Sequence, residues 1–304
     1  MKTIRLPIFA AMLWLSVPAF IAAAPAGCPP AGYDLAALDA LKARHFEFPD
    51  APERQAFARN LLACLYVTDA KLRDRIAYEA YATWRYNKSL DPATWKFIEN
   101  SLLATLQTSK DPDGVIRPFA ALVLAEAVKA DRGAPYLRED ERRLLLHAAT
   151  DYLIALRDYR GFDSDVGWRH GVAHAADLLA QLALSPGFGK TELEQILAAI
   201  AAQVVAADAH FYVYGESERL ASAVVAVASR EVYTSEEWSA WLTKVAGAAP
   251  FEKWDDLYWS QPGLAKRHDT MSFLVALYVQ SANDKRSAVR PLAPPALKAM
   301  QPLG

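Results

Sequence analysis

The sequence predicts an all-α protein, an array of about ten or eleven helices packed as antiparallel hairpins in a single domain. Three observations predict it. Apolar residues recur at helical spacing in segment after segment, and short turns rich in Gly, Pro, Asp and Ser separate these segments. No convincing run alternates apolar and polar residues as a half-buried strand does, since only the isolated stretch 211–214 has strand-like residues.

Caps and helix breakers justify the helices in chain order. Asp34 precedes the first apolar-periodic segment, and Asp91-Pro92 supplies an N-cap and a first-turn proline for a later one. Turns such as Ser185-Pro186-Gly187 end the intervening helices. The expected helices cover residues 34–44, 53–67, 69–86, 91–106, 119–129, 139–159, 167–184, 191–207, 216–230, 235–246 and 264–281.

Composition bounds the class of protein. The chain has 304 residues, 53% of them hydrophobic and 22% charged, with a formal net charge of −2. This is enough apolar material for one continuous core, and the charge lacks the basic excess that nucleic-acid binding requires. We expect one all-helical domain over residues 27–282 and a loosely ordered tail over 283–304, where four prolines accompany few large apolar groups.

Residues 1–26 have the pattern of an export signal. Lys2 and Arg5 precede an apolar run that ends near Ile21, and small residues follow it at 24–26. The run is too short and too proline-containing for a membrane anchor, so we expect no transmembrane helix in the mature chain. The expected location is the periplasm or the exterior. The alternative is a lipoprotein anchored at Cys28, because Ala26-Gly27-Cys28 has the small residues that precede a lipidated cysteine.

The chain has two cysteines, Cys28 and Cys64, and both follow the export signal. In an oxidising compartment they are candidates for one disulfide, worth roughly 2–4 kcal/mol. Lipidation of Cys28 would exclude that bridge.

The segment 160–184 concentrates residue types that form sites. On a helix that starts near Gly167, a polar stripe at i, i+4, i+7 and i+11 separates two packing faces. The stripe has three interpretations: a solvated helix edge, a metal site such as zinc with two imidazoles and a carboxylate as ligands, or a metal-free polar cleft. Its members are His170, His174, Asp177 and Gln181.

The loop before this helix is acidic and flanked by arginines. Its aspartates suit a turn and a helix N-terminus, and the arginines suit either ion pairs with those aspartates or contacts to a substrate. A later helix opens with Glu218 and Arg219, and Glu218 would lie beside the stripe if the two helices are neighbours. The candidate ligand-contacting residues are Arg160, Asp163, Asp165, Trp168, Arg169 and Arg219.

The central unit, R-G-F-x-S-D-x-G-W-x-H-x-x-A-H-A-A-D-L-L, resembles the bacterial domain-of-unknown-function family 2785, together with upstream VIRPFAALVLAEAVKAD and downstream ESERLASAV. The resemblance covers about residues 61–241. It implies a HEAT-like helical array, an α-solenoid, with no established activity. Arg169 stands where the family pattern suggests a small residue. The matching positions are Arg160, Gly161, Gly167, Trp168, His170, His174, Ala175, Asp177, Glu218 and Arg219.

Two classes of function remain open. The first is a binding protein of the cell envelope that presents the stripe and its loop to a small molecule, peptide or protein. The second is a hydrolase in which His170 or His174 acts as general base or metal ligand and Asp177 or Glu218 orients it. The sequence has no Gly-rich phosphate loop and no CxxC pair, so it requires no cofactor, although a divalent metal is compatible with it.

Overall fold

The structure is a computed structural model that describes residues 27–108 and 110–303. Helices dominate it, as predicted, and their buried side chains form one continuous hydrophobic core. The export segment predicted for residues 1–26 lies outside the described residues. In the described part, no helix is long and apolar enough to cross a lipid bilayer.

The N-terminal half of the described chain follows the predicted order of helices. Asp34 caps the first of them as expected, because its carboxylate accepts a hydrogen bond from the Ala37 amide at 2.8 Å. The elements are α1 (Leu35–Ala43), α2 (Ala51–Asn60), η1 (Leu61–Tyr66), η2 (Lys71–Tyr78), α3 (Glu79–Tyr86), α4 (Pro92–Thr108), α5 (Ile116–Gly133) and α6 (Glu139–Ala155).

The second half begins with a β-hairpin and continues with helices. Thr234 caps one of these helices by accepting from the Glu237 amide, while Glu237 accepts from the Thr234 amide. The elements are β1 (Phe162–Asp163), β2 (Gly167–Trp168), α7 (Gly171–Ala183), α8 (Lys190–Ala201), α9 (Glu216–Ala228), α10 (Ser235–Val245), η3 (Trp254–Trp259), α11 (Gln261–Ala282), η4 (Arg290–Leu292), α12 (Ala293–Met300) and η5 (Gln301–Leu303).

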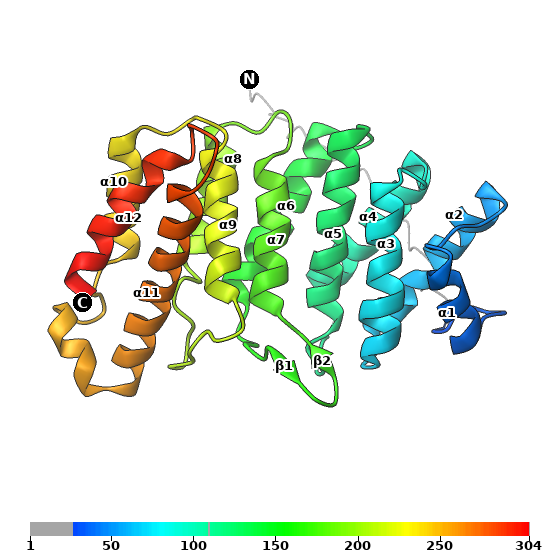
Figure 1. Ribbon diagram of the computed structural model, residues 1–304, viewed down its shortest axis with the longest axis horizontal. Helices are drawn as coiled ribbons and strands as arrows, with labels where there is room; N and C mark the ends of the chain where they lie inside the picture. Colours follow the sequence, from blue (N-terminus) through cyan, green and yellow to red (C-terminus); the bar gives the residue numbers. More distant parts are fainter. Residues whose placement is uncertain (1–26, 109, 304) are drawn as a thin grey trace, which may run out of the picture.

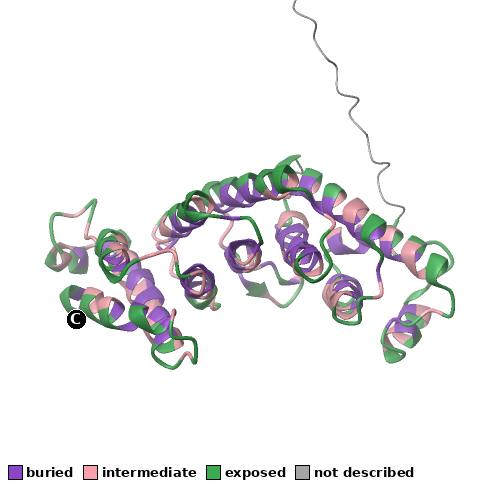
Figure 2. Cartoon of the chain, turned by 90° about the horizontal axis from the view of Figure 1, so that it is seen from above, coloured by how far each residue is buried: buried purple, intermediate pink, exposed green. Residues whose placement is uncertain are grey.

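The helices form two layers. Helices α3, α5, α7, α9 and α11 stand side by side in a row (Figure 1), and each packs against the next. Helices α4, α6 and α8 pack behind this row. Seen from above, the assembly bends, and the row lies along its inner side (Figure 2). We call the surface of this row the inner face. The classification as a HEAT-like solenoid stays a prediction.

Helix α7 is the centre of the row and packs against α5 on one side and α9 on the other. Its small residues Ala173 and Ala176 are fully buried, which allows these neighbours to approach closely. Leu178, Leu179 and Leu182 are fully buried as well, and each contributes roughly 1.5–3 kcal/mol by leaving water. Packing on both sides therefore holds α7 in one position, together with the polar residues along its edge.

One prediction about secondary structure is wrong. Helix α7 begins at Gly171 rather than near Gly167, because Gly167 and Trp168 pair with β1 in an antiparallel hairpin. Gly167 has a φ of +76°, a left-handed conformation that ends any helix there. The isolated stretch 211–214 is irregular, in agreement with the expectation that the chain has no convincing half-buried strand there.

The prediction of a loosely ordered tail over residues 283–304 is also wrong for the described residues, which end at 303. Its prolines stand in the first turns of η4 and α12, where a missing amide proton costs nothing. Leu292, Ala296 and Leu303 are buried, and α12 packs against α11. The prolines therefore mark helix starts rather than disorder.

Cys28 and Cys64 form a disulfide with an S–S distance of 2.05 Å. It joins the segment before α1 to the buried η1, so that the N-terminal end of the described chain is attached to the core. The Cys28 sulfur in this state has no free valence for a lipid.

Candidate functional site

The β-hairpin before α7 is held in place by three arginines. Arg73 is fully buried, and its Nη2 donates to the carbonyl oxygens of Val166 at 2.8 Å and Trp168 at 3.1 Å. Arg169 donates from Nε to the Asp113 carbonyl at 2.6 Å and pairs with Asp163. Arg73 and Arg169 therefore use their donors to hold the hairpin in place rather than to face a ligand.

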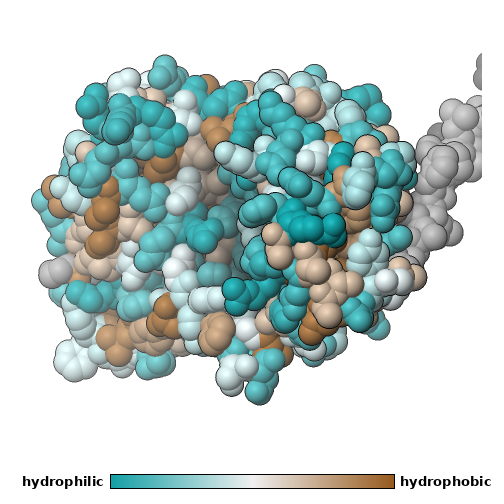
Figure 3. Space-filling model, turned by 45° about the vertical axis from the view of Figure 1, so that its right-hand side comes forward, coloured by the Kyte–Doolittle hydropathy of each residue, from teal (hydrophilic) through white to brown (hydrophobic). Residues whose placement is uncertain are grey.

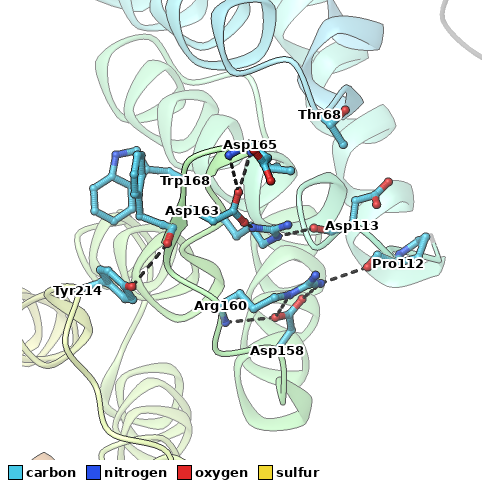
Figure 4. Close-up of polar contacts among 12 residues, drawn as sticks. Thr68, Pro112, Asp113, Asp158, Arg160, Asp163, Asp165, Trp168 and Tyr214 are labelled. Atoms are coloured by element: carbon cyan, nitrogen blue, oxygen red, sulfur yellow. Dashed lines mark hydrogen bonds and ion pairs between the residues drawn. The ribbon is translucent and has the colours of Figure 1, made fainter.

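Arg160 anchors the start of the same hairpin. It pairs with Asp158 rather than with an aspartate of the acidic loop, and its Nη2 donates to the Pro112 carbonyl at 3.1 Å (Figure 4). Gly114 leaves room for this contact, because a Cβ there would lie 2.3 Å from an Asp158 oxygen. Of the two alternatives for these arginines, ion pairs with the loop aspartates or contacts to a substrate, the structure shows the ion pair for Arg169 and not for Arg160.

The loop aspartates serve the turn. Asp163 Oδ1 accepts from the backbone amides of Asp165 at 3.0 Å and Val166 at 2.7 Å. These amides and Arg169 lower the pKa of Asp163. Asp165 itself is exposed. Turn formation accounts for the position of Asp163 without a ligand.

A recess lies behind the hairpin. It has a volume of about 130 Å³ and is lined by Asp111, Arg117, Tyr152, Asp158 and Arg169, among others. Most of its charged groups are already paired: Asp111 accepts from the amides of Val115 and Arg117. It therefore offers few unused polar groups to a ligand.

His170 occupies the N-cap position of α7 rather than a position on the helix. It has a left-handed φ of 59°, and its ring stacks on Trp168 with a centroid separation of 4.6 Å. Its Nε2 lies 2.7 Å from the Tyr214 carbonyl oxygen. Because a carbonyl only accepts, Nε2 must carry the proton, so Nδ1 is the basic nitrogen of the neutral ring.

His174 is buried, with 7% of its surface exposed. Burial lowers its pKa to about 3, assisted by His170 and Arg219, while a hydrogen bond to the Pro118 backbone opposes the change. Among the described residues, its Nδ1 has no hydrogen-bond partner. His174 is therefore neutral at pH 7 and packs edge-on against Phe119, which makes it a core residue rather than part of an exposed stripe.

The remainder of the stripe does lie on the inner face, where neighbouring helices supply its partners. Asp177 pairs with Arg219 of α9, and Gln181 accepts from Arg132 of α5 at 2.9 Å. Burial raises the pKa of Asp177, and Arg219 opposes that change. Figure 3 shows hydrophilic side chains around a hollow near the middle of the face it presents. One ion pair and one hydrogen bond thus connect α7 to its two neighbours across the row.

Glu218 does not join this arrangement. Helices α7 and α9 are neighbours, as its predicted role required, but Arg219 is the residue that reaches the stripe. Glu218 is exposed, and its backbone carbonyl accepts from Ser222 and Gln280. Its carboxylate makes no hydrogen bond to either histidine within the described residues.

The structure does not assemble the predicted metal ligands. Nowhere in residues 27–108 and 110–303 do three or more His, Cys, Asp or Glu side chains form a group that could hold a metal ion. His170 is turned toward Tyr214, His174 is buried against Phe119, and Asp177 is held by Arg219. Each predicted ligand therefore has a different environment.

An aromatic cluster stands beside the stripe. Phe162, Trp168 and Tyr214 are 50%, 39% and 38% exposed, yet their rings are neighbours. The centroids of Phe162 and Trp168 are 5.1 Å apart, and those of Trp168 and Tyr214 are 6.0 Å apart. Figure 4 shows Trp168 and Tyr214 side by side. Tyr214 lies directly over Gly161, where a Cβ would meet its ring at 2.0 Å.

Sequence reasoning missed Arg73, Arg132 and Phe162 as parts of this site. Arg73 sits within a helical segment 93 residues before its partner Val166, and nothing local distinguishes it from other helical arginines. Tyr214 was not among the candidate residues either, although its ring packs on Trp168 of the hairpin. The one local signal was Gly215, which follows Tyr214 and marks the turn before α9.

Comparison with known proteins agrees with the resemblance in the central unit. The model of the family described as "Protein of unknown function (DUF2785)" matches residues 102–279, more than half of the chain. The match begins later and ends later than the predicted 61–241. No curated protein and no solved structure matches the chain. The chain therefore belongs to the DUF2785 family of proteins of unknown function.

Proposed function

We propose that this protein is an exported binding protein whose inner face and aromatic cluster hold a polypeptide partner. The aromatic cluster carries the proposal. Three neighbouring aromatic side chains, Phe162, Trp168 and Tyr214, remain well exposed although burial would stabilise each of them. Grouped exposed apolar side chains mark interaction sites, and Trp and Tyr are enriched at the centres of protein interfaces.

The charged groups along α7 and its neighbouring helices suggest the chemistry of the partner. Asp177 is matched by Arg219, whereas Arg132 bonds to the uncharged Gln181 and has no carboxylate partner among the described residues. A guanidinium with unused donors recognises carboxylates well. We therefore propose an acidic segment as the partner, with its apolar side chains on the aromatic cluster. A curved row of helices suits this role, since helical-repeat proteins bind extended partners along such faces.

The hydrolase remains the alternative, but less supports it. An imidazole with a pKa of about 3, as in His174, is a weak base at neutral pH. His170 keeps a basic Nδ1, but no carboxylate orients its ring, because the Tyr214 carbonyl accepts its proton. A hydrolase requires a histidine and a carboxylate to meet, and the structure does not bring them together. A binding role has no such requirement.

Photocrosslinking tests the binding role. A benzophenone amino acid replaces Val213, which is 65% exposed beside the cluster, or Leu297, which is 49% exposed on α12. We expect a discrete adduct from position 213 in cells that make the protein, lost on Trp168→Ala and kept on Trp259→Ala, a tryptophan 87% exposed on η3. Identical adducts from both positions, or an adduct insensitive to Trp168→Ala, would refute the role of the cluster.

Export is part of the proposal and has its own test. The pattern at 1–26 and the Cys28–Cys64 disulfide both support it, because structural disulfides persist in oxidising compartments. Labelling the denatured protein from cells with a maleimide polymer counts free thiols. A disulfide in an exported chain leaves no thiol to react, and a lipid on Cys28 leaves Cys64 alone reactive. Reaction of both cysteines would show a reduced chain and overturn export.

A further inference from the structure

We propose that a second site, a pocket between the ends of α3 and α5 and the start of α4, binds a small organic monoanion with a compact apolar body. The pocket has a volume of about 200 Å³. It is separate from the aromatic cluster, so this inference goes beyond the proposed function.

Apolar and aromatic side chains provide the surface for the ligand's body. Leu90, Trp95 and Tyr136 line the pocket, together with Ala130. Trp95 is 3% exposed, and Tyr136 is fixed by a hydrogen bond from its hydroxyl to the Ala127 carbonyl at 3.0 Å. These side chains are therefore already ordered, and a ligand would not have to arrange them.

Three cations line the same pocket: Arg85, Lys88 and Lys129. One buried carboxylate, Glu126, lies between two of them and accepts from Arg85 Nε at 2.6 Å and Lys129 Nζ at 2.7 Å. Lys88 has no carboxylate partner within the described residues. The positive charge of the pocket thus exceeds its negative charge, and an anion would balance it.

Donors for such an anion are also present. The bond to Glu126 uses only the Nε of Arg85, and its two Nη nitrogens donate to no acceptor among the described residues. The Nζ of Lys129 has three protons, of which Glu126 takes one. Burial lowers the pKa of Arg132 at the same end of α5, and the positive charge of Arg85 lowers it further.

The volume limits the ligand. An apolar cavity of about 150 Å³ holds benzene, so a pocket of this size holds a single ring or a short branched chain. A carboxylate on that body would reach the cations at the rim. The rival explanation is that these cations only offset the dipoles of helix C-termini, as Arg85 does in the last turn of α3. That explanation requires no ligand.

Calorimetric titration of the purified protein with benzoate separates the two explanations. Benzamide, which has nearly the same shape and no charge, is the matched ligand. We expect saturable benzoate binding that is at least about tenfold tighter than benzamide binding, because a single hydrogen bond to a charged group is enough for a tenfold change in affinity. Absence of saturable benzoate binding, or equal affinity for the two ligands, would overturn the proposal.

Two variants locate the site. Lys88→Gln removes a cation that has no ion pair to lose, and we expect it to weaken benzoate binding about five- to tenfold. Its control is Lys298→Gln on α12, likewise an exposed lysine, which should change nothing. Ala130→Leu fills the pocket and keeps every charge, so it should abolish binding while the circular dichroism spectrum stays unchanged. Benzoate binding that survives both Lys88→Gln and Ala130→Leu would place it elsewhere.

Discussion

Replacing the buried Arg73 by methionine should destabilise the protein strongly, although methionine keeps the apolar stem of the side chain. Arg73 donates to Asp74 at 2.7 Å, and its Nη2 bonds to Val166 and Trp168 hold the hairpin. Its guanidinium also lies 4.4 Å from the centre of the Phe119 ring. Methionine keeps the packing of the stem, but it is too short to fill the space of the guanidinium and loses every one of these polar contacts.

The magnitude follows from what remains behind. Hydrogen bonds to charged groups contribute about 1.5–3 kcal/mol each, and breaking a buried ion pair costs about 3–5 kcal/mol because its partner stays buried. Both figures include the same contacts of Arg73, so they cannot be added. We therefore expect the free energy of unfolding to fall by about 3–5 kcal/mol. Asp74 adds a pH dependence. Burial already raises its pKa, and loss of Arg73 raises it further, so the deficit should be smaller at pH 4 than at pH 7.

Urea denaturation followed by circular dichroism measures the loss, and hydrogen exchange of residues 160–170 reports whether the hairpin opens. Arg75→Met is the control, because Arg75 is an exposed arginine of the same helical segment. It should change stability by about 0.5 kcal/mol or less. A loss for Arg73→Met as small as that of the control, with hairpin protection unchanged, would refute the anchoring role of Arg73.

Three further predictions concern other parts of the chain. The pKa of His174 is about 3 in the folded protein, against an ordinary 6.5. The unfolded chain therefore binds a proton at this residue more readily, so the free energy of unfolding is highest above pH 6.5 and falls as the pH drops toward 3. By pH 4.5 this loss is on the order of 3 kcal/mol, and pH-dependent denaturation of His174→Gln should lack it; equal slopes in both proteins would contradict the assignment. Reduction of the Cys28–Cys64 disulfide, which spans 36 residues, should lower the free energy of unfolding by about 3–4 kcal/mol in paired urea titrations, and an unchanged midpoint would argue against any constraint. Deletion of residues 284–304 should lower the melting temperature by several degrees, because it removes α12 from α11, whereas a loose tail would leave it unchanged.

The sequence alone determined the fold class and most helix positions. Helical periodicity, Asp34 and similar caps, and Pro or Gly breakers act within a few residues of one another, so they can be recognised without knowing the partners of each helix. The same local logic failed at 283–303, where prolines that begin helices resemble the prolines of a disordered tail.

The tertiary structure alone decided the site. One edge of α7 was predicted to be polar, but its residues have different environments. His174 packs in the core against Phe119, whereas Asp177 pairs with Arg219 and Gln181 bonds to Arg132. The partners of the hairpin lie up to 95 residues away in sequence, at Arg73. A helical period shows which residues share a face. It does not show what that face meets, because the packing of neighbouring helices depends on the whole chain.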